Sequence, residues 1–432
     1  MVAESHDPLR FRYLDPLDGL RVVYQPPPPG AASVTATYVG PAGWGFDAPG
    51  EEGAARLVSQ LVTSAAGPYN RVELARRLDR AGGTLTRQCA PESAEITVWG
   101  PADAWEELLR LLSLAVLEPR FDPEDVERAR RQLVERQLRE AAQPAQRAER
   151  ELLRSIFPSG HPYRTTGTGS PRSLRRLGRA RLARFHAEHF TGEGGLLVVT
   201  GPAGPEKIRA AARRRFSSFS RAKGPELRLP RPRAIEPVRH TIALAGRSQV
   251  DVRLGGPSLA RGDVRFPAAF LANEILGGRP LLSRLFQRVR ERGGLAYHAS
   301  SELEAMRLGG YWVAAAGTGA DRWKKVVPML EDELRKLREA SPTTAELDLI
   351  RESAVGEVPL SLESTSEAHE LAVDAAYHGL PEDHWVRWPS VLRQVRPAEV
   401  RDAARAAFGA LGAATVVAGP VGGPGRGKPS GG

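Results

Sequence analysis

GLLVVTGPAG at residues 195–204 and AATVVAGPVG at residues 413–422 are two versions of one pattern. Each is a short run of aliphatic residues that ends in a Gly-Pro turn, which is typical of a buried strand. The central valines, Val198 and Val416, lie about 220 residues apart. This repeat indicates that the chain consists of two homologous halves.

Helical segments repeat with the same spacing. RFDPEDVERARRQL (120–133) and ASPTTAELDLIRES (340–353) both place a proline and acidic residues at a helix start, where negative charge interacts favourably with the helix dipole. Each follows a Leu-rich amphipathic helix, at 105–119 and at 326–340. Chance similarity between common helix starts is the alternative, but the agreement of the two spacings favours homologous halves.

Strands with alternating polarity occur in both halves. VTATYVG (34–40) and AEITVWG (94–100) alternate as half-buried strands do. In the second half, TIALAG (241–246) and GGYWVAAAG (309–317) are strand candidates. Because long amphipathic helices follow these strands, we predict an α+β fold, with antiparallel-rich sheets and helices on one face of each sheet.

The same patterns predict the domain boundaries. We expect an N-terminal domain over residues 1–222 and a C-terminal domain over residues 238–422. The segment 223–237 between them is rich in Pro and Arg and has little periodicity, so we expect a linker. The Gly- and Pro-rich tail 423–432 cannot bury a core and is predicted to be disordered.

The composition excludes several classes of protein. One Cys among 432 residues rules out a disulfide framework, an iron–sulfur site and a cysteine-based zinc site. No run of about 18 apolar residues suits a transmembrane helix, and the N-terminus lacks the apolar core of a secretory signal. We therefore expect a cytoplasmic protein without a membrane partner.

The net charge of +10 arises from 61 Lys and Arg against 51 Asp and Glu. Such an excess can indicate nucleic-acid binding. The arginines, however, are spread along the chain and interleaved with glutamates, as in ERARRQLVERQLRE (127–140). RNA-recognition, zinc-finger and KH signatures are absent. We expect a solvated Arg-rich surface and no nucleic-acid partner.

The segment GGRPLLSRLFQRVRERGGLAYHASS (277–301) contains the groups GG, SRLF, VRE and GLAY in that order. It resembles the second-domain signature of the pitrilysin/insulinase family of zinc peptidases, which includes the mitochondrial processing peptidases. The first half agrees in register, because 40–67, 71–101 and 159–177 resemble that family's zinc-helix segment, helix-GG-strand segment and HP loop. The resemblance extends over about residues 10–422.

The resemblance implies a fold and an assembly. Members of this family have tandem α+β domains of about 220 residues, of the processing-peptidase/LuxS-like metallohydrolase type. Two such pairs of domains close like a clamshell around a peptide. We therefore expect two homologous αβ domains in this chain, in a clamshell arrangement with a partner chain.

The resemblance also identifies a departure on the first helix. Active members carry H-x-x-E-H there, in which two histidines ligate zinc and the Glu activates water. This chain has Arg56, Ser59 and Gln60 in place of the first His, the Glu and the second His. Arg has no lone pair for a metal, and Ser without a partner is no general base. The third ligand of the family falls at Glu135 or Arg136, and we expect no metal and no cofactor in this chain.

Another group of potential ligands is His186, Glu188 and His189, at the end of a predicted helix over 181–190. Histidines at i and i+3 can share a helix face, so spacing alone does not exclude a metal. Structural or surface histidines are the more common explanation of such a pair. Neither H-x-x-E-H nor H-E-x-x-H occurs anywhere in the chain.

The second-domain signature keeps the two residues that the family uses for catalysis from that domain, Arg290 and Tyr297. In the family, the Tyr donates a hydrogen bond to the oxyanion of the tetrahedral intermediate, and the Arg helps to orient it and to bind substrate. Preorganised donors of this kind stabilise developing negative charge. Arg292 is a neighbour that could take the role of the Arg. The alternative is that Arg290 forms an ion pair and Tyr297 packs on a strand.

Loss of the zinc motif together with an intact Arg–Tyr pair suggests a division of labour between two chains. We expect a non-catalytic subunit of a heteromeric zinc metalloendopeptidase, inactive alone, which supplies Arg290 and Tyr297 to a paralogous subunit that carries H-x-x-E-H and the zinc. It would bind an extended peptide at a sheet edge, for which the strand near 94–100 is the candidate.

Two other hypotheses stay open. The chain could be a catalytically inert structural or protein-binding homologue, as the core proteins of a respiratory complex resemble this family without cleaving peptides. It could also bind nucleic acid through its basic surface, which would make retention on DNA or RNA steeply dependent on salt.

Overall fold

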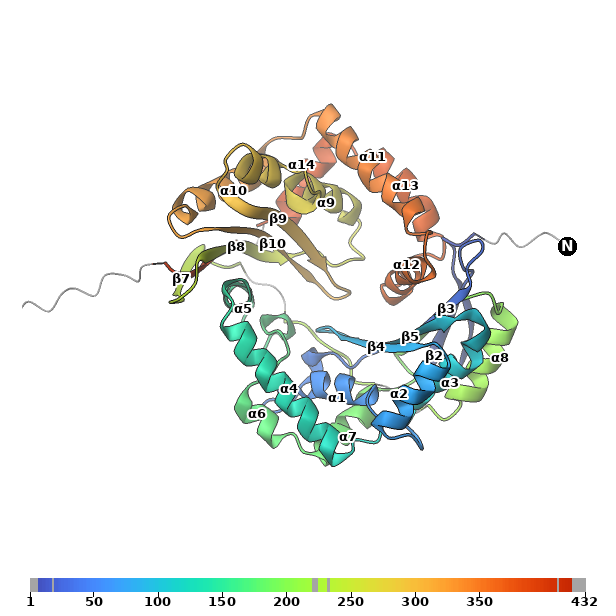
Figure 1. The fold of residues 1–432 in the computed structure, drawn as a ribbon. Coiled ribbons are helices and arrows are strands. Elements are labelled where there is room, and N and C mark those ends of the chain that lie inside the picture. Colours follow the sequence, from blue (N-terminus) through green and yellow to red (C-terminus); the bar gives the residue numbers. More distant parts are fainter. Residues whose placement is uncertain (1–6, 18, 220–223, 231–233, 410–411, 422–432) are drawn as a thin grey trace, which may run out of the picture. The chain divides into compact units, whose positions relative to one another are not determined.

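The computed structural model describes residues 7–17, 19–219, 224–230, 234–409 and 412–421. They form two compact units, coloured along the sequence in Figure 1. Unit 1 contains Met1–Glu135, Thr166–Arg228 and Gly356–Pro389. Unit 2 contains Arg136–Thr165, Leu229–Val355 and Ser390–Gly432. Each unit therefore combines most of one half of the chain with a short segment from the other half.

Unit 1 has a six-stranded sheet in the order β1-β2-β6-β3-β5-β4. Its strands are β1 (Arg12–Leu17), β2 (Leu20–Gln25), β3 (Ser33–Gly40), β4 (Thr84–Cys89), β5 (Ala94–Pro101) and β6 (Leu196–Thr200). Only β2 and β6 pair in parallel, and the other neighbours are antiparallel. The predicted antiparallel-rich sheet is confirmed.

Unit 2 has a five-stranded sheet in the order β7-β11-β8-β10-β9. Its strands are β7 (Val238–Ala243), β8 (Gln249–Ser258), β9 (Ala296–Ala305), β10 (Gly310–Gly319) and β11 (Ala414–Gly419). This order matches β2-β6-β3-β5-β4 of unit 1 strand for strand, including the single parallel pair. The two homologous halves are thus visible as one topology that occurs twice.

One face of the sheet of unit 1 packs against helices of the first half. They are α1 (Ala54–Val62), α2 (Arg71–Arg80), α3 (Trp105–Leu117), α6 (Pro171–Arg176), α7 (Arg179–His189) and α8 (Pro205–Phe216). Leu57 and Leu61 of α1, Leu112 of α3 and Ile96 of β5 are almost completely buried in this core. Successive strand residues point to opposite faces, so the apolar set Val34, Ala36 and Tyr38 of β3 also lies here.

The opposite face of the same sheet is covered by α12 (Thr365–Tyr377), a helix from the second half. Ala372 and Ala376 of α12 pack on Val23 and Val198, and these small side chains allow the helix to approach closely. In unit 2, α5 (Pro144–Ile156) from the first half packs in the same way on β8 and β11. The prediction of helices on one face only is therefore wrong, because the inner strands are apolar on both faces.

The remaining helices complete the two units. α4 (Pro123–Ala141), α11 (Thr344–Leu360) and α13 (His384–Gln394) run from one unit into the other. Unit 2 also contains α9 (Phe266–Asn273), α10 (Trp323–Glu339), α14 (Pro397–Ala407) and the π-helical turns η4 (Glu274–Gly278) and η5 (Phe286–Glu291). The helices predicted from the 105–119 and 326–340 patterns are α3 and α10.

The edge strands of the sheet of unit 1 are β1 and β4, and the strand near 94–100 is neither of them. That strand is β5, and it pairs with β3 on one side and with β4 on the other. The prediction that the strand near 94–100 lies at the sheet edge is therefore wrong by one strand. β4 has the short, polar sequence TLTRQC, and its Thr84, Thr86 and Gln88 are exposed.

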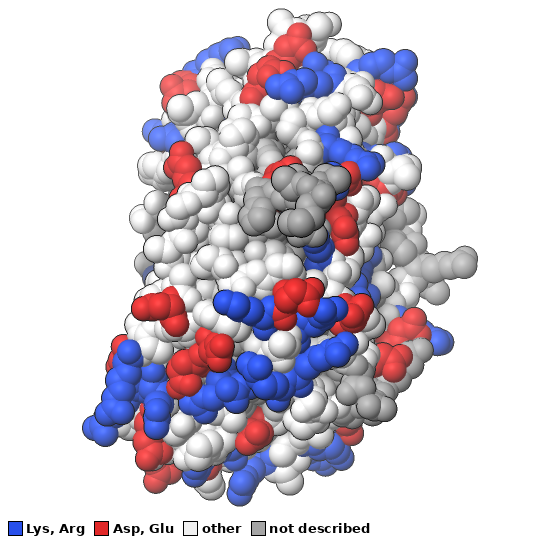
Figure 2. All heavy atoms as spheres, turned by 90° about the vertical axis from the view of Figure 1, so that its right-hand side faces the viewer, with Lys and Arg blue, Asp and Glu red and all other residues white. Residues whose placement is uncertain are grey.

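Basic and acidic side chains lie next to one another on the face shown in Figure 2. In α8, for example, Arg209 contacts Asp15 at 2.9 Å and also contacts Glu206. No helix in the described part of the chain is both long and apolar enough to span a membrane. Residues 224–230 and 234–237 of the predicted linker form neither helix nor strand, and the tail 423–432 lies outside the described residues.

Candidate functional site

The helix that carries the degenerate zinc motif, α1, begins at a fixed point. Asp47 accepts hydrogen bonds from the backbone N–H groups of Gly53 (2.7 Å) and Ala55 (2.8 Å). Gly53 has a φ of 100°, a conformation that glycine adopts without strain. Burial raises the pKa of Asp47 to about 7. These contacts set the direction in which α1 presents its side chains.

Arg56, which is predicted to stand at the position of the first family histidine, is held in place by neighbours in unit 1. Its guanidinium carbon lies 4.5 Å from the ring centroid of Trp44, a distance at which a cation is attracted to an aromatic face. Its Nε donates a hydrogen bond to the backbone carbonyl of Thr166 at 2.8 Å. A positive charge therefore stands where the family places a metal ligand.

Ser59 and Gln60 replace the Glu and the second His. Ser59 is 2% exposed, and its Oγ has no hydrogen-bond partner among the described residues. Gln60 donates from Nε2 to Oε1 of Gln132 on α4. A buried hydroxyl that no base contacts cannot activate water, so the helix offers no general base at the position of the family Glu.

The downstream position predicted for the third ligand lies on the surface of α4. Glu135 and Arg136 are exposed on α4, and Arg136 Nε donates to Glu140 at 2.6 Å. Over the described ranges, no group of three or more His, Cys, Asp or Glu side chains could hold a metal ion. A cation, a hydroxyl and an amide on α1 do not fit the zinc ion that the family binds there.

The histidines near the end of α7 have structural contacts. His186 Nε2 donates to the carbonyl of Val116 at 2.8 Å, and His189 Nδ1 donates to the carbonyl of Pro41 at 3.1 Å. Burial lowers the pKa of His186 to about 4. Phe190 stacks on His186 with 4.8 Å between ring centroids. These contacts support the structural explanation of the pair.

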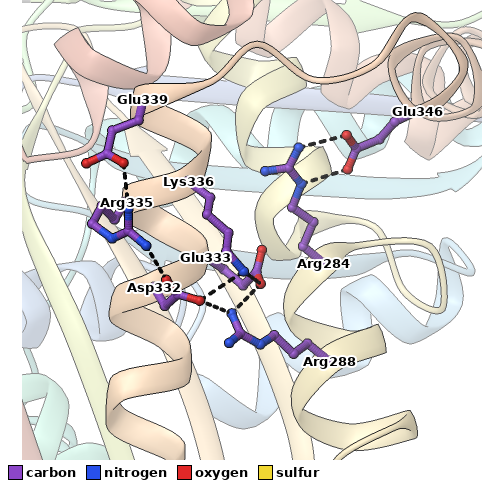
Figure 3. A network of polar contacts seen from close by, with 8 residues as sticks. All are labelled: Arg284, Arg288, Asp332, Glu333, Arg335, Lys336, Glu339 and Glu346. Atoms are coloured by element: carbon purple, nitrogen blue, oxygen red, sulfur yellow. Dashed lines mark hydrogen bonds and ion pairs between the residues drawn. The ribbon is translucent and has the colours of Figure 1, made fainter.

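The Arg–Tyr segment of unit 2 begins in η5, which ion pairs join to α10 and α11 (Figure 3). Arg284, just before η5, forms a bidentate pair with Glu346, with both N–O distances at 2.7 Å. Arg288 contacts Asp332 and Glu333 of α10. Bidentate pairs fix orientation as well as distance. Two arginines of the signature therefore hold this turn in place.

Arg290 and Arg292 differ from those two because both are exposed. The Arg290 guanidinium lies 4.8 Å from the ring centroid of Phe286. Within the described residues, Arg290 forms no ion pair. This stacking directs Arg290 while leaving its hydrogen-bond donors accessible, and Arg292 stands at the end of the turn.

Tyr297 lies in an irregularity of β9, the edge strand of the second sheet. Ala296 pairs with Thr318 and His298 pairs with Gly317, so Tyr297 is an extra residue in the strand. Such bulges redirect a side chain out of the regular pleat, and Tyr297 is 63% exposed. Its side chain is therefore not packed on the sheet.

The chain before Tyr297 is braced by two further hydrogen bonds. Thr318 Oγ1 donates to the carbonyl of Leu295. Arg322 Nη1 donates to the carbonyl of Gly294 at 3.0 Å. The turn that connects η5 to β9 is thus held at both of these carbonyls, and the segment presents an exposed arginine and an exposed tyrosine on a fixed support.

Sequence reasoning missed a polar network that joins α12 to the sheet of unit 1. His369 Nδ1 lies 2.8 Å from Thr200 Oγ1, and its Nε2 lies 2.7 Å from Thr37 Oγ1. Thr200 donates to Gln25 Oε1 at 3.1 Å, and Gln25 Nε2 donates to the carbonyl of Pro8. His369 is therefore neutral, donating from Nδ1 and accepting at Nε2. The only signal in the sequence is the run of threonines on one face of adjacent strands.

A pocket of about 510 Å³ lies in unit 1 beside this network. It is bounded by α12 on one side and by β3, β5 and β4 on the other. The pocket is lined by three residues of β5, Glu95, Thr97 and Trp99. They alternate along the strand with Ile96 and Val98, which are buried on the opposite face. The pocket also reaches the exposed edge strand β4.

Comparison with known proteins agrees with this fold. Residues 21–167 match the sequence model described as insulinase (peptidase family M16), and residues 176–354 match the model described as the peptidase M16 inactive domain. Together the two matches span most of the chain. The chain therefore belongs to peptidase family M16, the insulinase family, and it is a member without the H-x-x-E-H motif.

Relatives over most of the chain are described as zinc proteases. One from Mycobacterium tuberculosis is 27% identical over 350 residues, which are 81% of this chain and 79% of the relative. One from Bacillus subtilis is 24% identical over 355 residues, with 81% and 84% covered. A third, from Streptomyces coelicolor, is 32% identical over 193 residues, 43% of this chain and 41% of that one.

Solved structures show the same fold at lower identity. A peptidase M16 inactive domain from Pseudomonas fluorescens has a TM-score of 0.88 at 19% identity and covers 95% of this chain and 98% of its own. A protease from Helicobacter pylori has a TM-score of 0.86 at 17% identity, with 94% and 99% covered. These likenesses show that the fold of this chain also occurs in solved structures.

Proposed function

We propose that this chain is the non-catalytic subunit of a heteromeric zinc metalloendopeptidase. It would bind the peptide substrate and supply Arg290 and Tyr297 to the zinc site of a paralogous subunit that carries H-x-x-E-H. The observation that supports this proposal most strongly is the contrast between α1 and the Arg–Tyr segment of unit 2. The α1 positions hold side chains that cannot ligate a metal or activate water, whereas Arg290 and Tyr297 are exposed on a braced support.

The chemistry required of these residues is limited and suits their positions. When water attacks a peptide carbonyl, negative charge develops on the carbonyl oxygen. The phenol of Tyr297 can donate its O–H to that oxygen, and the guanidinium of Arg290 can orient the substrate through its N–H donors. Neither residue has to gain or lose a proton. The proton transfers of hydrolysis stay with the partner's Glu.

The edge strand β4 supports the second part of the proposal, peptide binding. One side of β4 pairs with β5, and the other side is the open edge of the sheet of unit 1. An extended peptide can pair with such an edge through main-chain hydrogen bonds, which give affinity without strict sequence selection. Exposed Thr84, Thr86 and Gln88 would flank the added strand.

Peptide cleavage in mixtures tests the proposal. The purified chain, the H-x-x-E-H paralogue from the same genome and their equimolar mixture are assayed, and zinc is quantified in each. We expect no cleavage by this chain alone, cleavage in the mixture, and zinc only in the partner.

Two results would contradict the proposal. Zinc-dependent cleavage by this chain alone would show that Arg56, Ser59 and Gln60 do not abolish the metal site. A mixture that neither associates nor cleaves would favour a catalytically inert structural or protein-binding homologue.

A further inference from the structure

The pocket beside β4 exists because α12 covers only part of the sheet of unit 1. The helix packs on β2, β6 and β3, so the same face of β5 and β4 is left uncovered. The side chains there are polar. Cross-strand pairing aligns Thr37, Thr97 and Thr86 in one row and Glu95 beside Gln88 in the next. A cavity with polar walls thus adjoins the edge that the proposed peptide would pair with.

Two polar side chains of the pocket, one half-buried and one buried, lack a hydrogen-bond partner in the described part of the chain. The half-buried carboxylate of Glu95 forms no hydrogen bond or ion pair with any residue that the structure describes. Burial raises the pKa of its carboxyl, and the neighbouring Glu370 raises this pKa further. Thr35 is 2% exposed, and its Oγ1 has no partner among the described residues. Unsatisfied buried groups of this kind cost free energy unless a ligand or water completes them.

The cations near Glu95 are engaged elsewhere. Arg87 donates to Thr63 Oγ1 at 3.1 Å, on the α1 side of the sheet. His378 Nδ1 lies 3.2 Å from Asp374, one turn away on the chain. Glu95 and Glu370 are therefore the carboxylates of the pocket that form no ion pair within the described residues, and the only nearby cation that acts on Glu95 is His378, which lowers its pKa in opposition to burial and Glu370. This local excess of negative charge contrasts with the net charge of +10 of the whole chain.

The other walls of the pocket are apolar and suit an alkyl chain. Trp99 of β5, which is 44% exposed, lines the pocket together with Val373 and Tyr377 of α12. Lys and Arg side chains combine an apolar stem with a cationic end. The pocket offers a suitable surface for each part, because its aromatic and aliphatic walls suit the stem and its carboxylates suit the cationic end.

The equivalent place in unit 2 has the same character although its residues differ. Glu149 on α5 occupies the repeat position of Glu370 on α12, about 220 residues earlier. It lies near Glu302, and both Glu149 and Glu304 have pKa values raised by burial. Both copies of the topology therefore keep carboxylates where the crossing helix meets the outer strands.

We propose that the pocket between α12 and strands β3, β5 and β4 binds the side chain of a Lys or Arg residue in a peptide that pairs with β4. Glu95 would receive the cationic end, Thr35 or Thr97 would contribute a hydroxyl, and Trp99 would cover the stem. The inference rests on the proposed function only in taking an extended peptide as the ligand, and it assigns a side-chain preference to that binding.

Binding to the chain alone tests this assignment without the partner or any activity. Fluorescence anisotropy gives the Kd for a labelled extended peptide with a central Lys and for the same peptide with norleucine at that position. We expect the Lys peptide to bind at least about tenfold more tightly. Glu95→Gln, which keeps the shape of the side chain, is expected to raise the Kd of the Lys peptide about tenfold and to leave that of the norleucine peptide within about twofold.

Glu367→Gln is the matched control, because Glu367 is an exposed carboxylate in the first turn of α12, the helix that borders the pocket. It should change neither Kd. Equal affinity for the two peptides, or no binding of either, would overturn the inference. Equal weakening of both by Glu95→Gln would assign Glu95 a structural role, and an equal effect of Glu367→Gln would assign the preference to general charge. Loss of cleavage in the two-chain mixture would bear on the proposed function and leave these Kd values unaffected.

Discussion

His369 shows how one residue can join two distant parts of the sequence. Its ring is buried between Thr37 of β3 and Thr200 of β6, and both ring nitrogens have a hydroxyl partner. Because the surroundings are dry, burial lowers the pKa of His369 to about 3. The residue therefore stays neutral, and its tautomer is fixed by the Gln25–Thr200 bond.

The lowered pKa of His369 predicts a specific dependence of stability on pH. The unfolded chain takes up a proton near pH 6.5, whereas the folded chain takes it up only near pH 3. The contribution of His369 is thus present above about pH 6.5 and is lost as the pH falls through this window, by at most about 1.4 kcal/mol per pH unit.

Urea unfolding at several pH values measures this effect. His369→Gln should lower the free energy of unfolding at pH 7 by about 1–3 kcal/mol through the lost hydrogen bonds, and it should flatten the decline between pH 6.5 and pH 4. Thr200→Val, which removes a bond but no titrating group, should lower stability with an unchanged slope. Parallel curves for His369→Gln and the unmodified chain would refute this account of His369.

The local sequence determines which segments form helices and strands, but it does not determine which of these elements pack against one another. The strands near 34–40 and 309–317 form as β3 and β10, because alternation specifies a strand with two different faces. The exchange of α5 and α12 could not be predicted, because the apolar face of a helix does not by itself specify which of two sheets it covers. The π-helical turn η5 and the bulge at Tyr297 could not be predicted either, because both depend on pairing with distant residues.

The exchange of helices predicts that neither half of the chain folds independently. A fragment of residues 1–222 lacks α12, so the face with Val23, Leu196 and Val198 would be exposed to water. We expect this fragment to bind a hydrophobic dye and to unfold without a cooperative transition.

Coexpression with residues 223–432 is the matching control. It should restore cooperative unfolding, because the second fragment supplies α12 and the first supplies α5. A monomeric 1–222 fragment with a sharp thermal transition and no dye binding would contradict the structural role assigned to α12.

At the scale of the whole molecule, the sequence was sufficient for the family and the two homologous halves, and the loss of the zinc ligands stays a prediction. These features rest on motifs and repeat spacing, which do not depend on tertiary contacts. The pocket near β4 and the division into units were not predictable, because each combines segments from both halves. What the chain keeps is a braced Arg–Tyr segment and an open sheet edge, and these are the parts that a substrate-binding subunit needs.

The effect of Tyr297→Phe on cleavage by the two-chain mixture tests the central claim most directly. The substitution removes a single O–H at a side chain that is 63% exposed, so folding should be unaffected. Tyr13→Phe, at another exposed tyrosine on an edge strand, is the matched control. We expect Tyr297→Phe to lower kcat about 100-fold with little change in KM, because the hydrogen bond forms mainly in the transition state, and Tyr13→Phe to change neither. An unchanged kcat for Tyr297→Phe in an active mixture would contradict the claim that this chain contributes to the catalytic site.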